Sequence, residues 1–158
     1  MKLSTIILSL LLTTFTMTTS AANGLITIES QHSVEATAQR FEQLIADKGL
    51  TFFTRINHSQ NAENVELSLR PTQVILFGNP VAGTALMNCT QTIAIDLPQK
   101  ALFWEDADGK SWLSYNDPYT LQTRHNLEEC DAVLEKIAEL LTNLASTVTS
   151  ADNVEESK

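Results

Sequence analysis

An Asp-Gly turn between two short runs of aromatic, β-prone residues limits how this chain folds. The runs are residues 101–105 and 111–115, and the turn between them is Asp-Ala-Asp-Gly-Lys. Because Asp-Gly favours the tight turns that join antiparallel strands, we expect a β-hairpin here. The acidic turn also has some features of a calcium loop, but an EF-hand needs a glutamate at its twelfth position. That position is Asp117, with Trp, Leu and Tyr in between, so the hairpin is the preferred interpretation.

The rest of the chain alternates between β-prone runs and segments with helical spacing. Ser33 is a good N-cap and Gly49 a good helix stop, which frames one amphipathic helix. A second, longer segment carries apolar residues at spacings of three and four from Leu127 to Leu144, the pattern of a narrow apolar seam. The expected strands are residues 25–28, 51–56, 72–77, 101–105 and 111–115, and the expected helices are residues 33–48, 81–92 and 127–144.

Strands that are interleaved with helices and end in a hairpin favour an α+β fold. We expect two layers, with a mixed sheet of about five strands in the order β-α-β-β-α-β-β-α and helices packed mainly on one face. A length of 158 residues and a hydrophobic fraction of 43% fit one globular domain. We place that domain at residues 23–148 and expect a flexible acidic tail at residues 149–158.

Residues 1–22 have the three-part pattern of a secretory signal peptide. Lys2 supplies the positive charge, residues 6–12 are apolar, and residues 20–22 are small. A membrane-spanning helix needs about 20 mostly apolar residues, and here threonines soon follow the apolar run. We therefore expect cleavage before Asn23 and a periplasmic or secreted protein that is free of the membrane after cleavage.

The charge balance excludes some classes of partner and cofactor. Ten Lys and Arg against 19 Asp and Glu give a net charge of −9, which argues against binding to nucleic acid or to anionic lipid surfaces. Two cysteines cannot form a four-thiolate zinc site, and we expect no metal and no cofactor. In an oxidising compartment Cys89 and Cys130 are a candidate disulfide; the alternative is two buried free thiols.

Several sequence blocks, in a fixed order, resemble the family known as the domain of unknown function 302. The blocks are residues 70–80, 83–87, 96–98, 101–109, 112–118 and 124–125, and the similarity covers about residues 52–125. The resemblance implies a compact α+β domain and supplies no mechanism. The family usually has an acidic residue before the histidine that matches His58, and here that residue is Asn57.

Three functional hypotheses remain open from the sequence. The favoured one is a non-catalytic module that binds or senses a small molecule, because polar residues end the strands around an apolar scaffold. Its candidate site residues are Asn79, Thr84, Tyr115, Asn116 and His125. The turn before the short helix at residues 81–92 is either a simple connection or an anion-binding cradle.

The second hypothesis is a hydrolase-like acid–base enzyme, in which His58 or His125 works with Asp117. Local hydrogen bonding by each histidine is the alternative role for these side chains. The third hypothesis is self-association, as a homodimer, through the apolar seam of the last helix.

Overall fold

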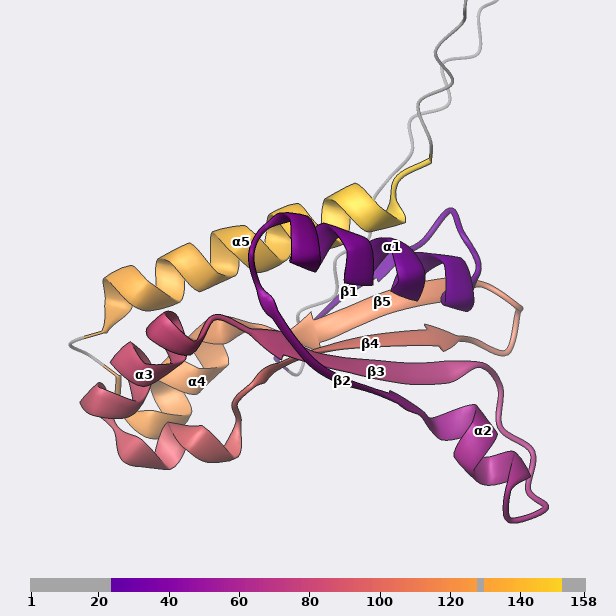
Figure 1. The fold of residues 1–158 in the computed structure, drawn as a ribbon, viewed down its shortest axis with the longest axis horizontal. Helices are drawn as coiled ribbons and strands as arrows, with labels where there is room; N and C mark the ends of the chain where they lie inside the picture. The colour runs from indigo at the N-terminus through magenta and orange to yellow at the C-terminus, as the bar shows by residue number, and fades with distance from the viewer. Residues whose placement is uncertain (1–23, 128–129, 152–158) are drawn as a thin grey trace, which may run out of the picture.

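The fold is built on one five-stranded sheet (Figure 1), and the computed structural model describes residues 24–127 and 130–151. The strands are β1 (Leu25–Glu29), β2 (Thr51–Asn57), β3 (Thr72–Gly78), β4 (Gln99–Glu105) and β5 (Ser111–Asn116). The helices are α1 (Val34–Asp47), α2 (His58–Glu63), α3 (Pro80–Cys89), α4 (Pro118–His125) and α5 (Asp131–Thr149), with a 3-10 helix η1 (Gln91–Ile95) after α3. The α+β class expected from the sequence is confirmed.

The sheet is antiparallel throughout, with the strand order β1-β5-β4-β3-β2, and the expectation of a mixed sheet was wrong. The physical reason is the connectivity. Strands β2 to β5 form a meander in which each strand pairs with its successor. α1 carries the chain from β1 at one edge to β2 at the other, so β1 pairs with β5 at its own edge.

α1 and α5 cover one face of the sheet, as Figure 1 shows. Alternate side chains of the strands point into this layer and are buried, as the period of a β-strand requires. Phe41 of α1 lies at their centre. The centroid of its ring is 4.9 Å from that of Phe77 and 5.4 Å from that of Phe103, and both pairs are edge to face. These aromatic contacts fix how α1 lies on the strands.

The last helix begins later and ends later than the sequence pattern predicts. α5 starts at Asp131 and continues to Thr149, so the tail expected from residue 149 begins after the helix; residues 152–158 lie outside the described residues. Every residue of the apolar seam is buried within the chain: Leu127, Cys130, Leu134, Ile137, Leu141 and Leu144. The seam therefore packs the fold itself and is not an exposed surface, and self-association as a homodimer stays a prediction.

Sequence reasoning missed α4. Asp117 caps this helix by accepting a hydrogen bond from the Tyr119 amide at 3.0 Å, and Pro118 occupies the first turn. Asn126, with φ of 53°, ends it in the left-handed region, which asparagine tolerates better than most residues.

The predicted signal peptide, residues 1–22, lies outside the described residues. Within the described part of the chain, no helix has the length and apolar composition needed to cross a membrane.

Candidate functional site

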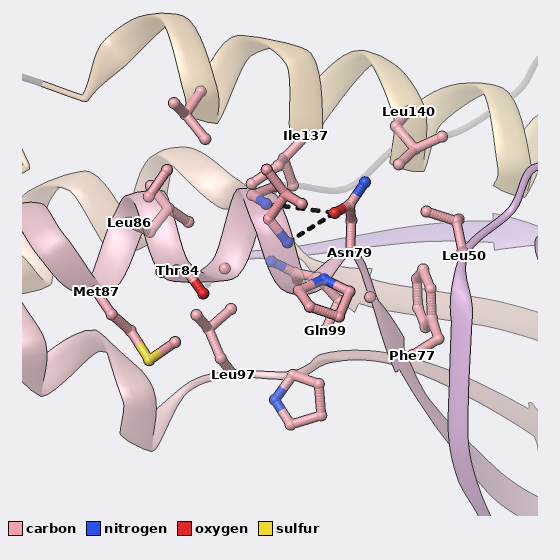
Figure 2. A pocket seen from close by; sticks show the side chains of 18 of the residues that line it. Leu50, Phe77, Asn79, Thr84, Leu86, Met87, Leu97, Gln99, Ile137 and Leu140 are labelled. Carbon is pink, nitrogen blue, oxygen red and sulfur yellow. Dashed lines mark hydrogen bonds between the residues drawn. The ribbon is translucent and has the colours of Figure 1, made fainter.

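A cavity of about 720 Å³ lies where α3 and α5 meet the ends of β3 and β4. This is the size of a typical small-molecule site. Figure 2 shows side chains of these elements gathered around it. Its apolar wall includes Leu50, Phe53, Phe77, Leu86, Met87, Leu97, Val133, Ile137, Leu140 and Leu141. Its polar side chains are Asn79, Thr84, Gln99 and Lys136. The cavity is therefore a mainly apolar chamber with a few polar groups.

The turn at Gly78 places α3 over the cavity. Asn79 caps the helix, since its side-chain oxygen accepts hydrogen bonds from the amides of Val81 at 2.9 Å and Ala82 at 3.4 Å. Pro80 occupies the first turn and has no amide hydrogen. Because Asn79 already uses the first free amides of α3, the turn is a capped connection and not an anion cradle.

The five predicted site residues do not form one site. Asn79 and Thr84 line the cavity, whereas Tyr115, Asn116 and His125 are not among its lining residues. Tyr115 is buried under α5, with its hydroxyl 3.5 Å from Thr142 Oγ1, and burial raises the pKa of its phenol. Asn116 ends β5 opposite Leu25. The sequence did not indicate Gln99 and Lys136, which carry no local motif.

His125 takes part in a separate polar cluster at the end of α4. Its Nε2 lies 2.6 Å from Asp96 Oδ2, and its Nδ1 lies 3.3 Å from the Thr92 hydroxyl. Arg124 donates a hydrogen bond to the other oxygen of Asp96 at 3.1 Å. The ring is only 6% exposed, so the cluster ties α4 to η1 and leaves little imidazole surface for a substrate.

The acid–base hypothesis relied on Asp117, and the structure does not bring Asp117 to an imidazole. Asp117 is the N-cap of α4, and His125 pairs with Asp96 instead. His58 is exposed at the start of α2. Among the contacts of the described residues, none joins either histidine to Asp117, so the proposed pair is not formed.

The acidic turn after β4 is a hairpin, as predicted. Asp106 accepts hydrogen bonds from the amides of Asp108 and Lys110 and from the Trp112 indole. The bond from the Lys110 amide and then that from Trp112 hold the pKa of Asp106 below its ordinary value. Gly109 has φ of 77°, a conformation that favours glycine. No group of three or more His, Cys, Asp or Glu residues in the described parts of the chain is arranged to hold a metal ion.

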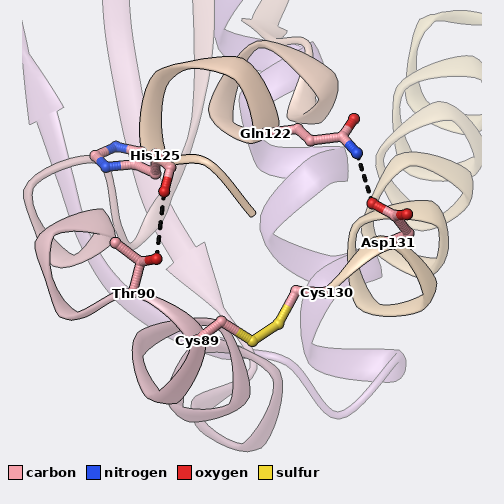
Figure 3. The surroundings of a disulfide bond; sticks show 6 residues. All are labelled: Cys89, Thr90, Gln122, His125, Cys130 and Asp131. Atoms are coloured by element: carbon pink, nitrogen blue, oxygen red, sulfur yellow. Dashed lines mark hydrogen bonds between the residues drawn. A yellow bond between two sulfur atoms is a disulfide. The ribbon is translucent and has the colours of Figure 1, made fainter. Parts of the chain in front are cut away.

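Cys89 and Cys130 lie at disulfide distance, with Cα atoms 6.6 Å apart (Figure 3). Cys89 is the last residue of α3, and Cys130 precedes the first residue of α5. Cys130 is buried, whereas Cys89 is exposed. The pair connects the two helices that form opposite walls of the cavity.

Comparison with known proteins identifies the family. The family model described as Domain of unknown function DUF302 matches residues 26–144. This chain belongs to the DUF302 family. The match includes α3, most of α5, strands β2 to β5 and all of β1 except Leu25, so it contains every described residue that lines the cavity.

Curated relatives of this DUF302 chain are longer proteins. A Brucella suis protein named fluoride-specific ion channel FluC 1 is 48% identical over 105 residues, which are 66% of this chain and 41% of the relative. A Brucella abortus protein of the same name is 48% identical over 105 residues, 66% of this chain and 39% of the relative. The chain thus spans about two fifths of the length of these relatives.

A solved structure shares the fold. The crystal structure of an uncharacterized conserved DUF302 protein from Bacillus stearothermophilus superimposes with a TM-score of 0.73 at 15% identity. The superposition covers 82% of this chain and 100% of that protein. At this identity the similarity concerns the fold alone.

Proposed function

We propose that this DUF302 protein is an exported, non-catalytic binding module, and that the cavity between α3 and α5 holds the apolar part of a small molecule. One observation carries the proposal: about 720 Å³ of mainly apolar space framed by two helices and two strand ends. An apolar chamber with a few polar groups is the usual form of a small-molecule site. Asn79 and Thr84, which the sequence suggested, are among its lining residues.

The chemistry of the walls favours binding over catalysis. Among the described residues that line the cavity there is no histidine, cysteine or acidic side chain, so these residues offer no general base or nucleophile of those kinds. Burial of an apolar ligand in such a chamber is favourable by about 25 cal/mol for each Å² removed from water. The export component rests on the signal-peptide pattern of residues 1–22.

Gly83→Leu gives a sharp test, because it fills the cavity without straining the fold. Gly83 lies in α3 and lines the cavity. A Cβ atom added there would meet only Leu97 Cδ1, at an ordinary 3.8 Å. Leucine also has a higher helix propensity than glycine, by roughly 1 kcal/mol. We expect the melting temperature to stay level or rise.

Binding of the neutral apolar fluorophore 1-aminoanthracene, measured by fluorescence titration, should be strong in the wild type and lost in Gly83→Leu. Ala46→Leu is the matched control, since Ala46 is exposed on α1 and does not line the cavity. Equal fluorophore binding by Gly83→Leu and the wild type, or no binding by the wild type, would contradict the proposal.

A further inference from the structure

The rim of the cavity carries a charge that is opposite in sign to the net charge of the protein. The chain has a net charge of −9, yet the one charged side chain among the described residues that line the cavity is Lys136 of α5. Lys136 is exposed and makes no ion pair with any other described residue. The acidic Glu135 and Glu139 line a different, shallow depression beside Tyr119 and Thr142. The rim of the cavity thus carries an available positive charge.

Gln99, at the start of β4, supplies a second hydrogen-bond donor beside the ammonium group of Lys136. Its Nε2 is buried and has no hydrogen-bond partner among the described residues. A buried donor without a partner costs about 1–3 kcal/mol, so its retention calls for an explanation. Gln99 lines the cavity, and its Nε2 has almost no accessible surface, so the side-chain amide has to rotate before an acceptor on a bound molecule can satisfy this nitrogen.

Asn79 adds a donor to the same cavity. Its side-chain oxygen is used by the cap of α3, as described above, which leaves the amide nitrogen as the group that a ligand can use. Lys136, Gln99 and Asn79 therefore all offer hydrogen-bond donors. A ligand that matches them carries acceptors and negative charge on one end and an apolar body on the other.

We propose that the ligand is an anionic amphiphile, with an apolar chain in the cavity and a carboxylate-like head group that accepts hydrogen bonds from Gln99 and Asn79 and pairs with Lys136. This inference rests on the proposed binding function. A cationic amphiphile would meet the charge of Lys136, and a ligand that is apolar throughout would leave Gln99 Nε2 unpaired. Ionised acceptors form the stronger hydrogen bonds, so the head group adds both affinity and orientation.

The experiment compares probes that share a twelve-carbon chain and differ in the head group. The processed protein, residues 23–158, is first loaded with 1-aminoanthracene. Displacement of this fluorophore then measures the affinity for dodecanoate, 1-dodecanol and dodecylamine, each below its critical micelle concentration. We expect dodecanoate to bind at least about tenfold more tightly than dodecanol, the effect of a hydrogen bond to a charged group. Dodecylamine should bind most weakly.

Two variants test which residues cause the preference for dodecanoate over dodecanol. Lys136→Gln should weaken dodecanoate about two- to fivefold, the range of an exposed ion pair, and leave dodecanol unchanged. Lys110→Gln is the matched control: it removes the same charge at the β4–β5 hairpin, at the opposite end of the sheet from α3 (Figure 1). Gln99→Leu should weaken dodecanoate about tenfold and also raise the melting temperature of the ligand-free protein, because it removes a buried unpaired donor.

The results distinguish a failure of the head-group inference from a failure of the proposed binding function. If dodecanoate and dodecanol bind equally, or Lys136→Gln and Gln99→Leu leave their ratio unchanged, the head-group inference is wrong and the binding function stands. If no probe binds and the fluorophore does not either, the proposed function itself fails. A lower melting temperature of ligand-free Gln99→Leu would show that Gln99 serves the fold, which would also overturn the inference.

Discussion

Single residues in this protein are held in place by partners far away in the sequence. Asn79 and Asp117 are helix caps, each followed by a proline at the first helical position, yet the sequence analysis assigned Asp117 to an acid–base pair. His125 is different, because its partner Asp96 is 29 residues away and no spacing rule indicates the pairing. The sequence analysis offered His58 or His125 with Asp117, whereas the carboxylate beside His125 is that of Asp96.

The His125 cluster should support stability. His125→Ala leaves the mostly buried Asp96 carboxylate without its closest partner, and we expect a loss of about 2–3 kcal/mol in the free energy of unfolding. Urea denaturation measures it. His58→Ala is the control, since His58 is exposed, and it should change stability by less than about 0.5 kcal/mol. Equal effects of the two substitutions would show that the cluster around Asp96 contributes nothing.

Glu35 should make stability depend on pH. Gln73 donates a hydrogen bond to Glu35 Oε2 at 3.0 Å, and Arg55 donates one at 2.6 Å. The bond from Gln73, then the charge of Arg55, lowers the pKa of Glu35 from its ordinary 4.5. Because the folded pKa is the lower one, the stabilisation is present above the unfolded value and is lost as pH falls through the folded one.

We therefore expect Glu35→Gln to be less stable than the wild type near pH 7, and we expect the difference to disappear as the pH falls through the lowered pKa of Glu35. The difference should stay below about 1 kcal/mol, because the Glu35 side chain is 54% exposed. Denaturation curves across this pH range measure it, and about 1 M salt should reduce the difference at neutral pH. A difference that grows as the pH falls would have the wrong sign for this mechanism.

At the scale of elements, periodicity and turn chemistry predicted most of the structure. α1, the β4–β5 hairpin and the buried seam of α5 follow from local pattern alone. α4 was missed because it has only eight residues, and its Asp-Pro start signal also suits a turn. Short helices depend on tertiary packing, which a local pattern does not contain.

The α3–α5 connection should depend on the cysteine pair. A bond between Cys89 and Cys130 closes a loop with a sequence separation of 41, for which the chain-entropy model gives about 4 kcal/mol of stabilisation. We expect no titratable thiols in denatured, unreduced protein. The double variant Cys89→Ser, Cys130→Ser should unfold at lower urea, and reduced wild type should match it. Two titratable thiols in freshly prepared protein would disprove the bond.

At the scale of the whole molecule, the sequence predicted the layers but not their arrangement. The α+β class and the coverage of one face follow from counting elements and apolar stripes. The strand order depends on α1 crossing the whole sheet, and the cavity depends on where α3, α5 and two strand ends meet. Those are properties of long-range packing, so Gln99 and Lys136 became candidate site residues only in the folded molecule.

Export is the remaining whole-molecule prediction, and the fold is compatible with processing. Cleavage before Asn23 would leave β1 intact, because that edge strand begins at Leu25 and is held by β5. We expect periplasmic protein to have the intact mass of residues 23–158. Leu10→Arg, which interrupts the apolar run of residues 6–12, should leave the full-length chain in the cytoplasm with both cysteines reduced, since a disulfide needs an oxidising compartment. Wild-type periplasmic material that retains residues 1–22 would instead indicate an uncleaved anchor. Free thiols in correctly cleaved protein would show that the chain is exported but that the disulfide does not form.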